Sequence, residues 1–207
     1  MTLVPKLGSA RAAAAELGRS PAEVEGVMTV DDLIAQYRSP YSAPPILALA
    51  GLDEVDWSAV SDAYGPATDI PALLRAAVSD NPDHRQFAYE LLYQTIWHQG
   101  NVYSATATAV PFLYNLLEAD GLHDKEAIAG LIAAIADGQP SFLHSETDSQ
   151  AAAQWRAILA KSGRSLDAEI AEGHKVAEAI RQQLARRPDL LAFCLQPRTD
   201  EESDAGE

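Results

Sequence analysis

The sequence lacks several features that define common classes of protein. It contains a single cysteine, Cys194, so no disulfide can form within the chain, as is typical of proteins in a reducing compartment. It has no run of about 18 apolar residues, so we expect no membrane-spanning helix. Residues 1–18 include no continuous apolar segment of the kind found in secretory signals. The sequence therefore predicts a cytoplasmic protein.

Basic side chains are also scarce. The chain has 15 lysines and arginines against 30 aspartates and glutamates, which gives a net charge of −15. A field of this sign repels the phosphates of nucleic acids and the headgroups of anionic membranes. We expect neither as a partner. Two interpretations stay open: the acidic surface only aids solubility, or it attracts a basic protein partner.

The motifs that identify common enzymes and metal sites are missing as well. There is no glycine-rich phosphate loop, no GxSxG and no HExxH. His144 and Glu146 match one half of a zinc deaminase signature, but the other half needs two cysteines. A hard metal on His144, Glu146 and Asp148 is conceivable, although a solvated polar loop is the simpler interpretation. We predict no catalytic residues, no metal site and no cofactor.

Composition and periodicity indicate an all-α fold. The chain is 47% apolar, rich in alanine and poor in strand formers. Residues 82–98 predict a central helix that is wet along one stripe and apolar on its other sides. A polar row and an aromatic row run along it at i, i+4 spacing: Gln86, Glu90, Gln94 and His98, then Tyr89, Tyr93 and Trp97. Gly100 is expected to end this helix.

Part of the sequence repeats at an offset of 40 residues. Residues 70–73 (IPAL) align with residues 110–113 (VPFL). The same offset pairs Asp80 with Asp120 and Arg85 with Lys125. Each unit reads as a helical hairpin that cannot bury its apolar face alone, so neighbouring hairpins are expected to stack.

This repeat carries a family resemblance. The pattern P-x-L…D…R-x-x-A-x-x-L-L, made by Pro71, Leu73, Asp80, Arg85, Ala88, Leu91 and Leu92, resembles a HEAT repeat. Residues 56–137 resemble small bacterial HEAT-repeat-like proteins. The second unit departs from the pattern, with Asp124 before Lys125 in place of an apolar residue. The resemblance implies a short α-solenoid that binds other proteins, and it assigns no catalytic residues.

These patterns divide the chain into three segments. Residues 1–55 are expected to form an irregular N-terminal extension, with short helices opened at Ser20 and Thr29 and a proline-rich connector. Residues 56–195 are expected to form the HEAT-like helical domain. It would begin with a short helix capped by Asp56 and end with helices over residues 151–161, 165–187 and 188–195. Residues 196–207 predict a disordered acidic tail.

The densest group of functional side chains lies in residues 97–104. One interpretation is a turn that presents Trp97, His98, Gln99, Asn101 and Tyr103 to a partner. The other gives each residue an ordinary role: Asn101 and Ser104 cap the next helix, while Trp97 and Tyr103 pack between hairpins. Asp83 and Asp124, near the predicted hairpin turns, are further candidates for binding a basic partner.

Two functions follow. The first is a non-catalytic module for protein–protein interaction, in its sharper form an immunity or antitoxin-type inhibitor of a basic partner. The second is an enzyme that uses His98 in a cleft between helical repeats. A pocket in which His98 meets a buried carboxylate would favour the enzyme, whereas an acidic groove would favour the binding module.

Overall fold

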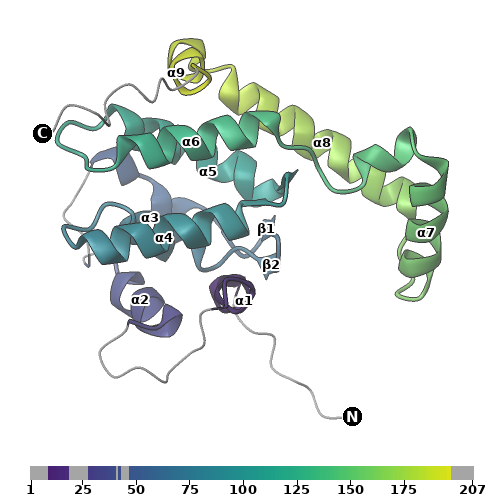
Figure 1. Cartoon of the computed structure of the whole chain (residues 1–207), viewed down its shortest axis with the longest axis horizontal. Coiled ribbons are helices and arrows are strands. Elements are labelled where there is room, and N and C mark those ends of the chain that lie inside the picture. Colours follow the sequence, from purple (N-terminus) through teal and green to yellow (C-terminus); the bar gives the residue numbers. More distant parts are fainter. Residues whose placement is uncertain (1–8, 19–27, 41, 43–46, 197–207) are drawn as a thin grey trace, which may run out of the picture.

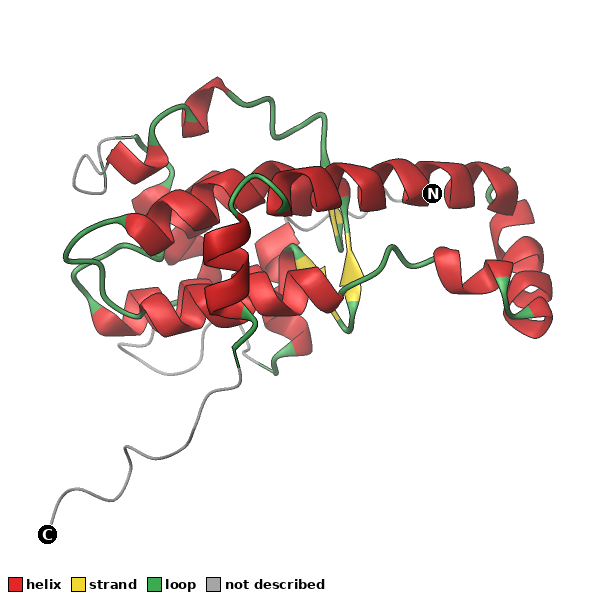
Figure 2. Cartoon of the chain, turned by 90° about the horizontal axis from the view of Figure 1, so that it is seen from above, coloured by secondary structure: helices red, strands yellow, loops and turns green. Residues whose placement is uncertain are grey.

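The computed structural model describes residues 9–18, 28–40, 42 and 47–196, and the fold is all-α as predicted (Figures 1 and 2). The α-helices are α1 Ser9–Glu16, α2 Val30–Tyr37, α3 Ile70–Ala76, α4 Pro82–Thr95, α5 Ser104–Glu118, α6 Lys125–Asp137, α7 Ser149–Ala160, α8 Leu166–Leu184 and α9 Pro188–Cys194. Short 3-10 helices are η1 Leu47–Leu49, η2 Leu52–Glu54 and η3 Leu143–Glu146. Two antiparallel hairpins pair β1 Ser61–Asp62 with β2 Gly65–Pro66 and β3 Trp97–His98 with β4 Asn101–Val102.

The two N-terminal helices pack on the body of the protein. In α2 the predicted capping box is present: Asp32 N donates to Thr29 Oγ1, and Thr29 N donates to Asp32 Oδ2, both at 3.2 Å. In α1 the buried alanines lie against α4, and Ala10 N donates to Asp69 Oδ2 at 3.2 Å. Both helices therefore share one core with the helices that follow. The helix predicted from Ser20 and the tail 197–207 lie outside the described residues.

Helices α3 and α4, and then α5 and α6, form the two predicted hairpins (Figure 1). Pro71 lies in the first turn of α3, where a missing N–H costs nothing. Asn81 caps α4, its side chain accepting from Asp83 N at 2.9 Å. The side chain of Asp80, the turn residue of the repeat, is exposed and is not the cap.

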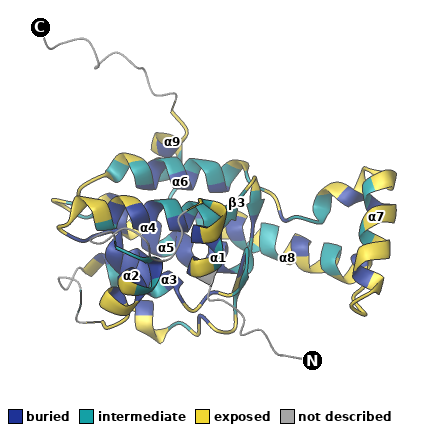
Figure 3. Cartoon of the chain, turned by 60° about the horizontal axis from the view of Figure 1, so that its bottom comes forward, coloured by how far each residue is buried: buried dark blue, intermediate teal, exposed yellow. Residues whose placement is uncertain are grey.

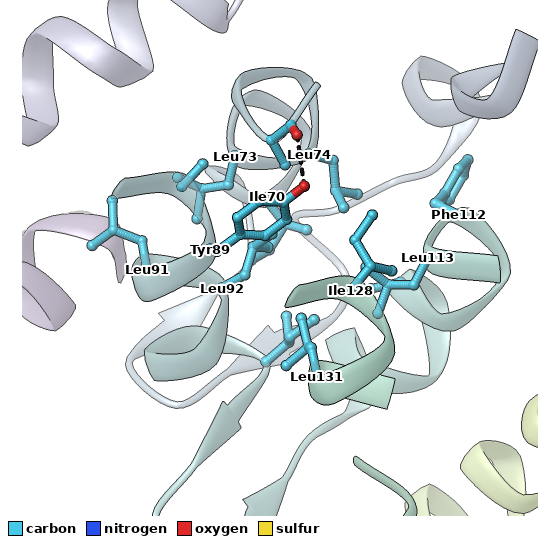
Figure 4. Close-up of a cluster of buried hydrophobic side chains, with 14 of the residues drawn as sticks. Ile70, Leu73, Leu74, Tyr89, Leu91, Leu92, Phe112, Leu113, Ile128 and Leu131 are labelled. Atoms are coloured by element: carbon cyan, nitrogen blue, oxygen red, sulfur yellow. Dashed lines mark hydrogen bonds between the residues drawn. The ribbon is translucent and has the colours of Figure 1, made fainter. Parts of the chain in front are cut away.

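The core lies between these two hairpins. Leu91 and Leu92 of α4 are fully buried. Leu92 points towards Leu113 of α5 and Leu131 of α6, whereas Leu91 points away from these two and lies on the side of Leu73 of α3 (Figure 4). The hydroxyl of Tyr89 donates to Ala77 O at 2.9 Å, which satisfies the polar end of that ring in the core. Cys194 is buried, as expected for a small core residue.

The helix predicted after Asp56 is wrong. The Asp56 side chain accepts from Ser58 N at 3.1 Å, which makes a turn, and the chain then forms the β1–β2 hairpin. Asp62 closes that hairpin by accepting from the N–H groups of Tyr64 and Gly65. Local side-chain hydrogen bonds thus compete successfully with the helix here.

The predicted extent of the central helix is also wrong, because α4 ends at Thr95 rather than at His98. Gln99 and Gly100 have φ of 50° and 83°, as a two-residue hairpin turn requires. The hairpin extends its hydrogen bonding to Gln139, which donates to Gly100 O at 2.9 Å and accepts from Val102 N at 3.2 Å.

Helix α5 begins without the predicted caps. Its N-cap residue is Tyr103, whose N–H donates to Thr106 Oγ1 at 2.8 Å. Ser104 Oγ accepts instead from Ser61 N at 2.8 Å, and so ties α5 to the β1–β2 hairpin.

Helix α7 and the first half of α8 form an arm that projects from the body (Figures 1 and 3). A second small cluster holds it together, in which the rings of Phe142 and Trp155 meet edge-on at 5.0 Å. The second half of α8 returns to the body and packs on α5, where the hydroxyl of Tyr114 donates to Leu184 O at 3.1 Å.

Gly138 is predicted to tolerate no side chain. A Cβ there would lie 2.6 Å from Val102 Cγ1 and 3.3 Å from Trp97 Cδ1, although its φ of −76° suits any residue. Gly138→Ala should therefore destabilise the protein by about 1–3 kcal/mol through overpacking. Asp137→Ala, at the exposed neighbouring position, is the control. Equal thermal midpoints for the two variants would show that the hairpin yields to the added methyl group.

Candidate partner-binding surface

A cleft of about 1010 Å³ runs along α4. Its floor is one face of α4, and its walls come from the end of α1 and from the start of α6 with the loop before it. The lining residues are Leu17, Pro82, Arg85, Gln86, Tyr89, Glu90, Tyr93, Gln94, Leu122, Asp124, Lys125, Glu126 and Ala127.

The floor of this cleft is the wet stripe that the sequence predicts for the central helix. Gln86 and Glu90 lie one turn apart, with Gln86 Nε2 donating to Glu90 Oε1 at 3.2 Å. Tyr89 and Tyr93 run beside them, and the ring of Tyr93 meets that of Trp97 edge-on at 5.9 Å. Burial raises the pKa of Tyr89 above its ordinary value. The floor thus combines carboxylate and amide groups with the edges of aromatic rings.

One end of the cleft lies at the turns of the two hairpins. Arg85, only 8% exposed, joins these turns: its Nε donates to Asp124 Oδ2 at 2.6 Å, and its Nη1 donates to Ser79 O and Asp80 O at 2.8 and 3.1 Å. Asp124, a predicted partner-binding residue, therefore has a structural bond. Asp83 is exposed in the first turn of α4.

The other end of the cleft is lined by Gln94 and Leu17, and His98 lies beyond it, next to Gln94. His98 Nδ1 is 3.0 Å from Gln94 Oε1 and 3.5 Å from Tyr64 Oη, while Nε2 is 3.4 Å from Glu16 Oε2. The rings of His98 and Tyr64 meet edge-on at 5.6 Å. Burial, followed by a hydrogen bond to Glu16, raises the pKa of Tyr64. His98 therefore joins α1 to the end of α4.

The remaining predicted site residues have mixed surroundings. Gln99 is exposed at the hairpin tip. Asn101 is half-buried and forms an isolated bridge with Gln139. Tyr103 is half-buried, and burial raises its pKa to about 12. Trp97 packs against the core, and its buried Nε1 has no hydrogen-bond partner among the described residues.

The structure thus separates the predicted residues into two groups. Asp83 and Asp124 lie at the start of α4, and the group from Trp97 to Tyr103 lies beyond its end, with about 20 Å of helix between them. The cleft connects the two ends. The sequence shows the polar row and the aromatic row within residues 86–94. It does not show that α1 and α6 lie on either side of them, so the cleft could not be predicted.

A second cleft, of about 540 Å³, lies between α5 and α8. Pro111 lies inside α5 and lines this cleft. Its missing N–H leaves the carbonyl of Ala107 without the usual helical donor. The charged residues on its rim, Glu172 and Lys175, pair with each other at 3.0 Å.

Comparison with protein-family models, curated proteins and solved structures finds no match to this chain. Within the described ranges, no helix is long and apolar enough to span a bilayer. In the same part of the chain, no three histidine, cysteine, aspartate or glutamate side chains are grouped as a metal site would need.

Proposed function

We propose that the protein is a non-catalytic protein-binding module of HEAT-like paired helices, and that it receives a basic partner along α4. The observation that carries this proposal is the cleft along α4, which has acidic side chains at both ends in a chain of net charge −15. Glu16, the last residue of α1, lies next to Leu17 at one end, and the exposed residues Asp80, Asp83 and Asp120 belong to the turns of the two hairpins at the other end or to the first helical turn after them.

The exposed aspartates are expected to raise the rate at which a basic partner associates with this surface. Charges near an interface steer a partner of opposite sign and raise the on-rate more than they raise the affinity. Their effect reaches about 10 Å at 0.1 M salt. Asp80, Asp83 and Asp120 fit this role because their side chains are exposed, whereas Asp124 is bonded to Arg85.

An immunity or antitoxin-type inhibitor is the sharper form of this function. Such an inhibitor covers the basic surface that a toxin uses on its own target, so it needs an acidic surface and no chemistry of its own. The charge sign and the small size of this chain support that form.

Catalysis at His98 has less support. Neither the cleft along α4 nor the cleft between α5 and α8 is lined by His98. Its carboxylate neighbour, Glu16, is about half exposed, so it is not the desolvated acid that would tune a general base. The buried carboxylate of Asp62 accepts two backbone N–H groups of its own hairpin. These contacts fit a structural role for both groups.

The test is capture of the partner by the wild-type protein and by the variant Asp80→Lys/Asp83→Lys/Asp120→Lys. Proteins from the native cell that bind the wild type are identified by mass spectrometry, and their association rates are then measured. We expect a basic partner whose on-rate falls at least about tenfold for the variant in about 50 mM salt. The double variant Asp137→Lys/Asp167→Lys, with exposed positions away from the cleft, is the control. An acidic partner, or equal rates for all three proteins, would contradict the proposal.

A further inference from the structure

We propose that the cleft along α4 takes one basic, amphipathic α-helix of the partner, laid along the floor of the cleft. This inference rests on the proposed function and names the chemistry of the segment that binds. Four properties of the cleft support it: the bonding of its walls, its length, the chemistry of its lining and its charge.

The walls favour a helix over an extended segment. They consist of the end of α1, the start of α6 and the short loop before α6, and the floor is α4. Backbone N–H and C=O groups inside a helix are already paired, so these walls offer no strand edge for an extended peptide. An extended occupant would therefore find no ladder of backbone partners in these walls. A helix satisfies its backbone internally and needs only side-chain contacts.

The length fits a short helix. The floor runs from Pro82 to Gln94, twelve steps along α4, which is about 18 Å or three turns. The cleft volume of about 1010 Å³ is at the upper end of the range for small-molecule sites. An elongated trough of this size suits one face of a helix of three to four turns, the usual mode in which a groove binds a helix.

The lining favours an occupant with one apolar and one cationic face. Leu17, Leu122 and Ala127 supply apolar contacts on the walls. The floor places Tyr93 beside Glu90, a pair that can hold an ammonium or guanidinium group by cation–π attraction and an ion pair. An amphipathic helix of leucines and lysines matches both kinds of contact.

The charge of the cleft supports a basic occupant over an acidic one. The charge of Arg85 is neutralised by Asp124 at 2.6 Å. The other charged side chains of the lining are Glu90, Glu126 and Lys125, which sum to a negative charge. An acidic segment would also meet Asp83 and Glu16 at the two ends.

The experiment that tests for a helical occupant compares two matched substitutions in the full chain. Gln86 on the cleft floor and Gln182 on α8 each donate a hydrogen bond to a glutamate one turn away, at 3.2 and 2.9 Å. Gln86→Lys and Gln182→Lys therefore change the net charge equally, but only the first puts a cation in the cleft. The probe is a synthetic helical peptide of lysine and leucine, about 15 residues long. Its dissociation constant is measured by isothermal titration calorimetry in about 50 mM salt.

We expect Gln86→Lys to weaken binding of this peptide at least about fivefold, and Gln182→Lys to change it less than about twofold. A peptide of the same composition with two central prolines cannot form the helix and should also bind at least about fivefold more weakly. Circular dichroism checks that both variants fold. If Gln86→Lys alters the fold, Glu90→Gln and Glu178→Gln repeat the comparison without an added charge.

Each alternative outcome has a definite meaning. Equal effects of the two glutamine variants, or no binding by the wild type, would overturn the cleft as the site. Equal binding of the proline peptide would overturn the helical occupant. Neither result would decide the proposed function, because the capture experiment with the variant Asp80→Lys/Asp83→Lys/Asp120→Lys tests that function separately.

Discussion

Replacing Leu91 with alanine is expected to lower the free energy of unfolding by about 2–5 kcal/mol, the largest loss we predict for a change of a single apolar side chain. Leu91 is fully buried in α4 and lies on the side of Leu73 of α3 (Figure 4). Its truncation removes apolar contacts and leaves a cavity that the surrounding helices can fill only in part. Urea unfolding of the wild type and the variant measures the difference in the free energy of unfolding, provided that its dependence on urea concentration is the same for both proteins.

The chain offers a matched control for this variant. Leu47, in η1, is 91% exposed, so Leu47→Ala removes the same atoms without opening a cavity. We expect its effect to stay within about 0.5 kcal/mol. Similar midpoints for Leu91→Ala and Leu47→Ala would mean that the core does not lie where the structure places it.

The sequence predicted the parts of the fold whose signals are local. The polar stripe of α4, the capping box of α2 and the hairpins that contain Pro71 and Pro111 all depend on residues within one or two helical turns. Each signal recurs several times, so an error at one residue does not change the element.

The two β-hairpins could not be predicted in the same way. A strand of two residues has no period, and Trp97 and His98 continue the i, i+4 rows of α4 in sequence. Distant partners decide the matter: Gln139 bonds to Gly100 and Val102, and Ala63 N donates to Thr95 O at 3.0 Å. Tertiary hydrogen bonds therefore overrode helix periodicity at the end of α4.

The candidate site was predictable in its residue types but not in its geometry. Asp83 and Asp124 looked alike in sequence, as acids near a hairpin turn. Only the structure shows that Asp124, at a left-handed φ of 57°, reaches back 39 positions to Arg85. The cleft itself needs α1 and α6 on either side of α4, and no local pattern encodes that placement.

The surroundings of His98 could not be predicted from local sequence either. A histidine at the end of a polar row suggested a partner-binding residue or a general base, but its neighbours come from distant parts of the chain. Tyr64 belongs to the β1–β2 hairpin, and Glu16 belongs to α1. With Gln94 they connect three elements through His98, which gives this histidine structural contacts.

Replacing Arg85 with methionine is expected to destabilise the protein by about 2–4 kcal/mol. Methionine keeps most of the aliphatic stem of Arg85 but none of its donors. The carbonyls of Ser79 and Asp80 then lose their bonds to the guanidinium at 2.8 and 3.1 Å, and Asp124 loses its partner. A buried acceptor without a donor costs more than the bond itself contributes, and Ser79 lies at a buried position.

Asp124→Asn separates the two roles of this arginine. Asp124 is about half exposed, so water replaces much of what the ion pair loses, and we expect a cost below about 1 kcal/mol. Chemical unfolding of Arg85→Met, Asp124→Asn and the double variant forms a cycle that isolates the pair from the bonds to the turn. Equal losses in the two single variants would assign the effect to the ion pair. The expected inequality assigns most of it to the carbonyls of the α3–α4 turn, which Arg85 holds at the acidic end of the cleft.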